Sequence, residues 1–370
     1  MAIHIERLNI NYFRGINGLA LNGLNHVNII GGDNNSGKTS VLEAILLLRN
    51  PKDFNNVKRI ARTRNRGFRI STTSVYEDFI NLFPRNNDQM MISLDGVCIG
   101  EPVKLCLTGD QKMILLANEE LYQSYTQSAR HQQTMQYPDG LETSAFKGEL
   151  KYSFADEHGH VPIDFHKHGR NIIVIDNNYY LNIVYTATVD HIRENIFSKI
   201  LHDDLYKDIC ISVLRLFDSQ ILDILYLRNE DTDRPVEYVK HAVLGNMPLS
   251  TFGDGVKKVL SLANGIAQAT NGILMIDELE TAIHSKYYDE IFRFIIKACK
   301  QFQVQLFITT HSIEAIDALL AVQDYDNHDS DDVSVITFQK YPDSQRTYSR
   351  TLNGRNVLQN REEFGFEVRL

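Results

Sequence analysis

Residues 32–39 combine glycines, a lysine and a threonine at the spacing of a phosphate-binding loop. They read Gly-Asp-Asn-Asn-Ser-Gly-Lys-Thr, which fits the pattern GxxxxGK[ST], and they lie between an expected strand and an expected helix. In such a loop, backbone N–H groups surround the phosphates, Lys38 reaches the β- and γ-phosphates, and the Thr39 hydroxyl ligates Mg²⁺. The expected nucleotide-binding residues are Gly32, Asn34, Asn35, Ser36, Gly37, Lys38, Thr39 and Ser40. This loop therefore predicts binding of ATP together with Mg²⁺.

Two carboxylates follow a second apolar strand, at 273–276. Because ligands of a parallel sheet bind at the carboxyl ends of its strands, we expect Asp277 to hold the Mg²⁺ water shell and Glu278 to polarise the attacking water. A third apolar strand ends at His311, which we expect at the same sheet edge as a sensor of the γ-phosphate. The predicted catalytic residues are Lys38, Glu278 and His311, and the predicted metal ligands are Thr39 and Asp277.

The elements that must position these residues alternate between strands and helices. Near the N-terminus, alternating apolar residues predict a strand over 3–12, a second over 26–30 and a helix over 38–49. After Leu249 the pattern predicts a helix at 255–269, a strand at 272–276, a helix at 285–302, a strand at 304–309 and a helix from Ser312. This order indicates α/β layering around a parallel sheet.

The middle of the chain has a different pattern. Residues 88–117 are expected to form β-strands, 118–170 a polar insertion, and 189–228 amphipathic helices that make a helical lobe. An acidic loop at 324–332 leads to an expected hairpin. The predicted domains are an N-terminal ATPase lobe at 1–117, the insertion and helical lobe at 118–244, a C-terminal ATPase lobe at 245–323, and a hairpin and tail at 324–370.

Composition narrows the class of protein. The 370 residues are 43% hydrophobic and 23% charged, and no run approaches the roughly 20 apolar residues of a membrane span. With no basic and apolar leader at the N-terminus, we expect a cytoplasmic protein that does not contact membranes. The net charge of −9 argues against a general affinity for nucleic acid. Six basic residues between Lys58 and Arg69 form either a solvated loop or a local patch for phosphate or DNA.

The order of these motifs is that of ABC-type ATPases. The chain resembles the SMC-like branch, and most closely the overcoming-lysogenization-defect (OLD) group and its relatives in bacterial anti-phage systems. The matching segments are Asn11-Tyr12-Phe13-Arg14-Gly15, the loop at 32–39, Phe252-Gly253-Asp254-Gly255-Val256-Lys257-Lys258, Ile276-Asp277-Glu278-Leu279-Glu280 with His284, and Ile308-Thr309-Thr310-His311-Ser312. The expected fold is α/β: an ABC-type P-loop ATPase head with an N-terminal β-rich lobe, a polar insertion and a helical lobe.

The resemblance implies a head-to-head homodimer, or a higher homo-oligomer, that sandwiches two ATP molecules. Gly253 and Gly255 would then bind the nucleotide held by the other subunit. The family's signature serine is replaced here, and Ser250 lies a few residues too early. By the same resemblance Arg14 approaches the nucleotide; the alternative is an arginine in a surface turn.

The expected function is a Mg²⁺-dependent ATPase that regulates or scaffolds a separately encoded effector, a nuclease or toxin, in anti-phage defence. The chain ends at residue 370, 59 residues after His311, which is too short for the nuclease domain of fused OLD proteins. One alternative is a RecF-like or SMC-like DNA-repair ATPase that binds DNA, although the net charge and the Gly-Asp-Gly signature argue against it. Another is an ATP-dependent structural scaffold with little turnover.

Overall fold

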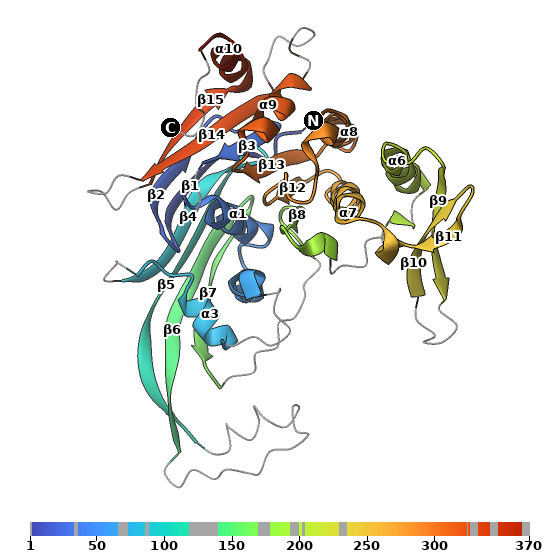
Figure 1. The fold of residues 1–370 in the computed structure, drawn as a ribbon. Helices are drawn as coiled ribbons and strands as arrows, with labels where there is room; N and C mark the ends of the chain where they lie inside the picture. The colour runs from blue at the N-terminus through green and yellow to red at the C-terminus, as the bar shows by residue number, and fades with distance from the viewer. Residues whose placement is uncertain are drawn as a thin grey trace.

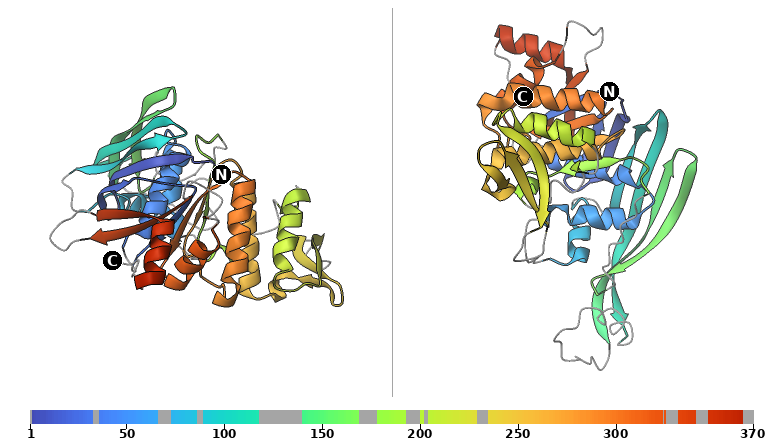
Figure 2. Two further views of the ribbon diagram at one scale, coloured as in Figure 1. Left: turned by 90° about the horizontal axis from the view of Figure 1, so that it is seen from above. Right: turned by 90° about the vertical axis from the view of Figure 1, so that its right-hand side faces the viewer.

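The computed structural model describes residues 2–32, 36–65, 73–85, 89–117, 140–168, 178–192, 200–201, 204–228, 235–323, 325, 332–340 and 347–364. Within these ranges the strands form a central mixed sheet, an N-terminal antiparallel sheet and a small third sheet. The antiparallel sheet and the third sheet lie on opposite sides of the central sheet (Figures 1 and 2).

The central sheet has the order β15-β14-β3-β13-β12-β8. Its strands are β3 (Val27–Gly31), β8 (Ile183–Thr186), β12 (Ile273–Ile276), β13 (Gln305–Thr310), β14 (Val333–Lys340) and β15 (Thr347–Asn353). All neighbours pair in parallel except β14 and β15. Every residue of β3, β12 and β13 is buried, as expected for parallel strands covered on both faces. This confirms the predicted α/β class and brings the carboxyl ends of β3, β12 and β13 to one edge.

Helices cover the central sheet. They include α1 (Lys38–Leu46), α7 (Asp254–Gln268), α8 (Tyr288–Gln301) and α9 (Ile313–Ala321), with one-turn helices η1 (Leu47–Arg49), η4 (Leu249–Thr251) and η5 (Ser285–Tyr287) at their ends. The Ser312 hydroxyl accepts a hydrogen bond from the Ala315 N–H and caps α9, where the sequence places a helix start. Downstream, α10 (Gly354–Phe364) packs on α9 through Val357 and an Arg361–Asp317 ion pair, and the sequence did not predict it.

The N-terminal sheet has the order β2-β1-β4-β5-β6-β7. Its strands are β1 (Ile5–Phe13), β2 (Ile16–Leu21), β4 (Met90–Cys98), β5 (Glu101–Leu116), β6 (Leu141–Phe154) and β7 (Glu157–His166). Strands β6 and β7 fall in the stretch expected to be an insertion, yet β6 pairs with β5 along its whole length. The sheet therefore continues across the boundary expected at residue 117. Beyond its pairing with β4, the β5–β6 hairpin projects away from the body (Figure 1).

A second group of helices packs between the N-terminal sheet and the central sheet. These are α2 (Phe54–Ala61), η2 (Thr63–Asn65) and α3 (Val75–Ile80). The Phe79 ring lies edge-on to Phe54, Phe146 and Phe165, with centroids 5.1 to 5.4 Å apart. Phe79 is fully buried, so this aromatic cluster anchors α3 to the strands.

The third sheet corrects the expectation of helices over 189–228. Among the described residues there, η3 (Asp190–Ile192), Ile200 and α6 (Asp204–Leu214) are helical, but β9 (Ile221–Arg228) pairs with β10 (Pro235–His241), which pairs with β11 (Gly245–Pro248). Ile221 and Ile224 have helical spacing but pack on Val239 of the neighbouring strand. Short apolar runs do not distinguish a strand from a helix, so tertiary pairing decided the outcome.

Among the described residues, no helix has the length and apolar composition needed to span a bilayer.

Candidate active site

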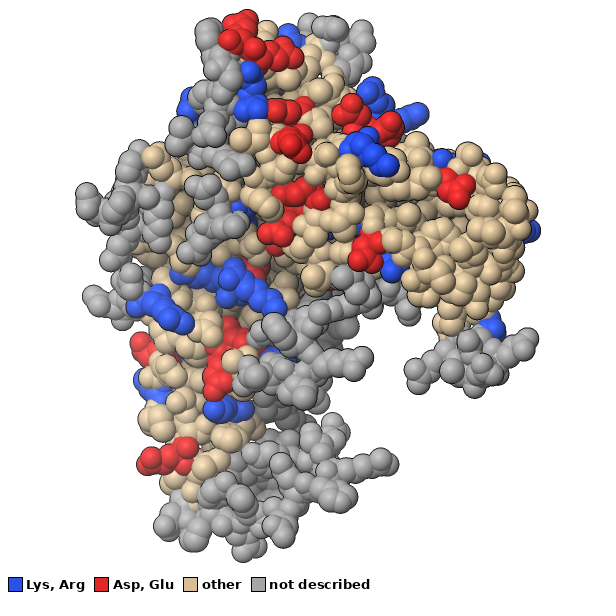
Figure 3. Space-filling view, viewed as in Figure 1, with Lys and Arg blue, Asp and Glu red and all other residues tan. Residues whose placement is uncertain are grey.

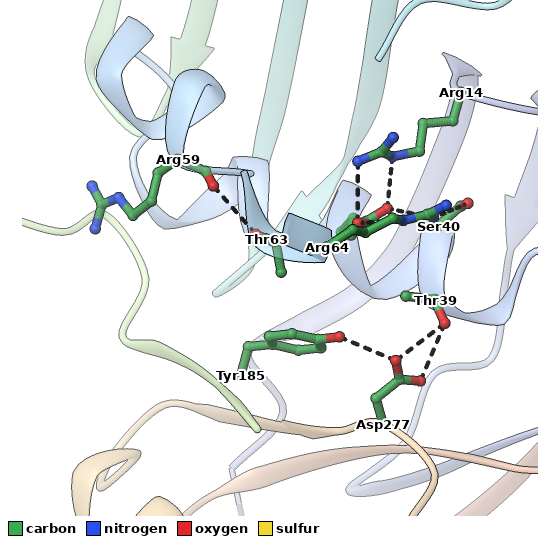
Figure 4. Close-up of polar contacts among 9 residues, drawn as sticks. Arg14, Thr39, Ser40, Arg59, Thr63, Arg64, Tyr185 and Asp277 are labelled. Atoms are coloured by element: carbon green, nitrogen blue, oxygen red, sulfur yellow. Dashed lines mark hydrogen bonds and ion pairs between the residues drawn. The ribbon is translucent and has the colours of Figure 1, made fainter. Parts of the chain in front are cut away.

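The carboxylate of Asp277 follows the end of β12, and the hydroxyls of Thr39 and Tyr185 point toward it (Figure 4). The Thr39 hydroxyl lies 3.1 Å from Oδ2 and 3.3 Å from Oδ1 of Asp277. Two further hydroxyls donate to it, that of Tyr185 to Oδ2 at 3.1 Å and that of Thr309 to Oδ1 at 2.5 Å. Asp277 is only 7% exposed, and these donors compensate for burying its charge. The two predicted metal ligands are therefore neighbours.

The donor set around Asp277 fits Mg²⁺. Hydroxyl and carboxylate oxygens are the hard ligands that this ion prefers, and adjacent ligands of an octahedral Mg²⁺ lie about 3 Å apart. The Thr39 and Asp277 oxygens already have this separation. Bound there, Mg²⁺ would neutralise charge on the phosphates.

The phosphate-binding loop has the backbone conformation that its glycines permit. Gly32 and Gly37 have φ angles of 143° and 102°, in the region that disfavours residues with a Cβ. Lys38 is 8% exposed, and its ammonium donates to the Gly32 carbonyl at 2.7 Å. Among the described residues, the buried Ser36 hydroxyl has no hydrogen-bond partner, as expected for a group that awaits a phosphate. The expected ligands Asn34 and Asn35 lie outside the described residues.

Glu278 follows Asp277 in a strained conformation. Its φ angle is +51°, and its N–H donates to the Thr309 hydroxyl at 2.9 Å. Its carboxylate lies 3.5 Å from the Thr188 hydroxyl. Non-glycine residues in left-handed backbone cost on the order of 1 kcal/mol and cluster at functional sites. The Thr309 hydroxyl thus holds the carboxylate of Asp277 and the backbone N–H of Glu278.

His311 lies at the end of β13 and is held by Glu280. Its Nδ1 is 2.9 Å from Glu280 Oε1, and the same oxygen accepts the His311 N–H at 3.0 Å. The carboxylate sets the orientation of the imidazole ring, whose side chain is 50% exposed. The geometry therefore places His311 at the sheet edge of Asp277 and Glu278.

Arg14 forms an ion pair with Glu43 of helix α1. Its Nε lies 2.7 Å from a carboxylate oxygen of Glu43 on α1, and Arg64 binds the same carboxylate through two nitrogens at 2.7 and 2.8 Å. Arg64 also donates to the Ser40 hydroxyl at 3.0 Å. The Glu43 side chain is fully buried, so both arginines neutralise it. Burial lowers the pKa of Arg14, an effect that Glu43 opposes.

The expected signature loop forms the start of α7. Gly253 is the N-cap residue, is exposed, and makes no side-chain cap hydrogen bond, so the first N–H groups of a 15-residue helix have no side-chain cap. A Cβ at Gly255 would lie 2.9 Å from the Ala282 carbonyl, whereas one at Gly253 would meet nothing within 4 Å. An open helix N-terminus of this kind suits an anion.

Sequence reasoning missed the residues that support this site. Tyr185 and Glu43 were not singled out, and Glu280 and Thr309 entered only as parts of motifs. Tyr185 lies in the four-residue strand β8, which carries no recognisable spacing. In the sequence, Glu43 is an acidic residue among the apolar residues of an expected helix, which was the one indication of a special role. The structure buries it on α1.

Fold and site together define the class of protein: the chain is an ATPase with an α/β P-loop fold. Residues 176–317 match a family described as "AAA domain, putative AbiEii toxin, Type IV TA system", and residues 3–58 match one described as "Protein of unknown function (DUF2813)".

Similar proteins agree with this class. A Helicobacter pylori protein named ATP/GTP phosphatase is 24% identical over 383 residues, covering 95% of this chain and 96% of that protein. The DNA replication and repair protein RecF of Idiomarina loihiensis is 43% identical over 95 residues, 25% of this chain and 26% of that protein. In fold, the chain is similar to an SMC head solved in complex with the C-terminal winged-helix domain of ScpA, with a TM-score of 0.53, 12% identity and coverage of 96% and 99%.

Proposed function

We propose that the protein is a Mg²⁺-dependent ATPase of the OLD and SMC-like group that dimerises around ATP and controls a separately encoded effector. The observation that carries the ATPase part is the convergence of Thr39 and Thr309 on Asp277, with Glu278 held beside it. Residues from both ends of the chain build one site of the composition that phosphoryl transfer needs.

Each side chain has a separate task in this proposal. Lys38 leaves the Gly32 carbonyl and binds the β- and γ-phosphates, while the Ser36 hydroxyl and the loop N–H groups donate hydrogen bonds to the phosphate oxygens. Thr39 and Asp277 hold Mg²⁺. Glu278 accepts a proton from the attacking water, and His311 donates to the γ-phosphate.

The exposed start of α7 supports the dimer. Gly253 and Gly255 present backbone N–H groups without a side-chain cap, and a nucleotide bound to a second copy of the chain supplies the anion. The similarity in fold to an SMC head is consistent with this arrangement, and Arg14 acts by holding α1 through Glu43.

The defence role rests on the matched family, whose description names a putative toxin of a type IV toxin–antitoxin system. An effector nuclease or toxin is the proposed partner. The test is native mass spectrometry of the protein with its neighbouring gene product, with and without ATP. ATP-dependent dimers that bind the partner are expected; a protein that stays monomeric with ATP and binds no partner would contradict the proposal.

A second candidate is a RecF-like ATPase that binds DNA. The 43% identity to RecF over 95 residues favours it and weakens the sequence-based argument against it. Within the basic cluster, however, Arg62 and Arg64 pair with Asp78 and Glu43. On the face in Figure 3, basic side chains are interspersed with acidic ones rather than forming one continuous surface. Duplex binding whose affinity falls steeply with salt would favour this candidate.

A further inference from the structure

A cavity of about 490 Å³ lies along β8, the outer strand of the central sheet. Its walls come from the end of α1 and from α2, from β8 with the residues before it, and from α7. Its lining includes Arg49, Arg59, Tyr185, Asn264 and Gln268. The volume falls within the usual range of small-molecule sites.

The lining is cationic. Arg49 and Arg59 line the cavity, and none of the described lining residues is acidic. Arg49 lies 4.3 Å from the Tyr179 ring centroid, and its buried Nε has no hydrogen-bond partner among the described residues. Guanidinium groups are suited to phosphate because their donors match two oxygens at once. The charge of this cavity therefore selects an anion.

A buried amide in the same wall also has an unfilled partner position. Asn264 is 4% exposed, and within the described part of the chain its Oδ1 accepts no hydrogen bond. It belongs to a polar stripe on α7 with Ser261 and Gln268, spaced three or four residues apart so that they share one face. Leaving a buried amide oxygen unpaired is costly, and a ligand that donates a hydrogen bond removes the cost.

The cavity is also connected to the catalytic centre. Tyr185 lines it and donates its hydroxyl hydrogen bond to Asp277 (Figure 4). Thr186, the next residue of β8, accepts the Asp277 N–H through its carbonyl at 3.0 Å. A ligand that shifts β8 therefore changes the position of the Mg²⁺ aspartate directly.

We propose that this cavity binds a nucleoside monophosphate, at a site separate from the ATP site, and that occupancy alters ATP hydrolysis through Tyr185. Arg49 and Arg59 receive the phosphate, and Asn264 and Gln268 receive the base or sugar. The site is distinct from the P-loop in its residues, because no described residue of 32–39 lines the cavity.

Binding is tested in the full chain carrying Lys38→Ala, which disables the P-loop, by calorimetric titration with AMP, GMP, CMP and UMP. At least one should bind with a Kd below about 1 mM, and the matching nucleoside should bind about tenfold more weakly or worse. Adding Arg59→Gln or Asn264→Leu should weaken binding about tenfold, whereas adding Arg85→Gln, at an exposed arginine outside the cavity, should not. No saturable binding by any of the four, or equal binding by all variants, would overturn the proposal.

Coupling is tested with Lys38 intact, as the ratio of ATPase rates with and without the bound monophosphate at saturating ATP. The ratio should differ from one by at least about twofold, and it should return to one in Arg59→Gln and in Tyr185→Phe. A ratio unchanged by Arg59→Gln would mean that the monophosphate competes at the P-loop, and the regulatory site would be rejected. The first experiment does not depend on ATP hydrolysis, so its outcome is separate from that of the proposed function.

Discussion

The Thr309 hydroxyl lies 2.5 Å from Asp277 Oδ1 and also accepts the N–H of Glu278 at 2.9 Å. One buried hydroxyl therefore fixes both the expected metal ligand and the expected general base. Because Thr309 is fully buried, no solvent molecule can replace it without rearrangement.

Thr309→Val should raise the Mg²⁺ concentration needed for half-maximal ATPase activity several-fold and lower kcat about tenfold. The isosteric methyl group leaves Asp277 with one donor fewer and Glu278 with an unpaired N–H. A Mg²⁺ titration of ATPase activity measures both effects. Thr309→Ser keeps the hydroxyl and should restore most of the activity; if it fails as badly as valine, packing rather than hydrogen bonding explains the loss.

Lys38→Ala should abolish measurable ATP binding, because it removes the cation for the β- and γ-phosphates. Titration with ATP and Mg²⁺ gives the affinity, and Lys297→Ala, at an exposed lysine of α8, is the matched control. An affinity within about threefold of the unmodified protein, on the order of 0.7 kcal/mol, would remove the P-loop assignment.

Glu278→Gln should leave ATP binding intact and lower hydrolysis by about a hundredfold or more, because the amide cannot accept the proton of water. Native mass spectrometry should then show an accumulated ATP-bound dimer. Glu290→Gln, at an exposed position of α8, controls for the loss of one charge. Hydrolysis at the unmodified rate would assign the general base elsewhere.

Gly253→Arg should leave ATP binding nearly unchanged and block hydrolysis, since it obstructs the open start of α7. The structure favours this position over Gly255, where a side chain would press on the Ala282 carbonyl within its own subunit. Mixed with Lys38→Ala, it should recover activity, because both lesions fall on one composite site and leave the other intact. If Gly253→Arg alone hydrolyses ATP normally, the signature role of α7 is wrong.

Lys258 gives a pH-dependent prediction. Its side chain is fully buried on α7, and within the described part of the chain its ammonium has no hydrogen-bond partner. Burial lowers its pKa from 10.5 to about 8, which four nearby carboxylates only partly oppose. These carboxylates are Asp190, Asp277, Glu280 and Glu278.

Because the folded pKa is the lower one, the unfolded chain binds more protons between pH 8 and 10.5, and stability rises with pH across that window. The cost of burying the charged Lys258 ammonium is fully present below pH 8. Lys258→Met removes it, so the stability advantage of the variant over the unmodified protein should shrink by about 2 kcal/mol between pH 7 and 9.5. Urea unfolding at the two pH values measures this. Lys257→Met, at a neighbouring lysine paired with Asp254, is the control, and an equal trend there would contradict the assignment.

The sequence was informative where function demands fixed spacing. The loop at 32–39 and the acidic pair Asp277-Glu278 correctly indicated the strands and helices beside them, because few backbone conformations can bind a phosphate. The supporting contacts could not be predicted, since Tyr185 approaches Asp277 only through the pairing of β8 with β12. In the same way Ile221 and Ile224 fit a helix locally, and only the partner strand β10 makes them part of a sheet.

The β5–β6 hairpin is long, so its far end lies at a large distance from its base. At about 3.3 Å per residue, the 16 residues of β5 extend about 50 Å from the turn after β4 to Leu116. A rotation of about 5° at the base of such a strand displaces its far end by about 4 Å. Small angular changes of the ATPase body are therefore amplified into translations at the end of the hairpin, far from the nucleotide.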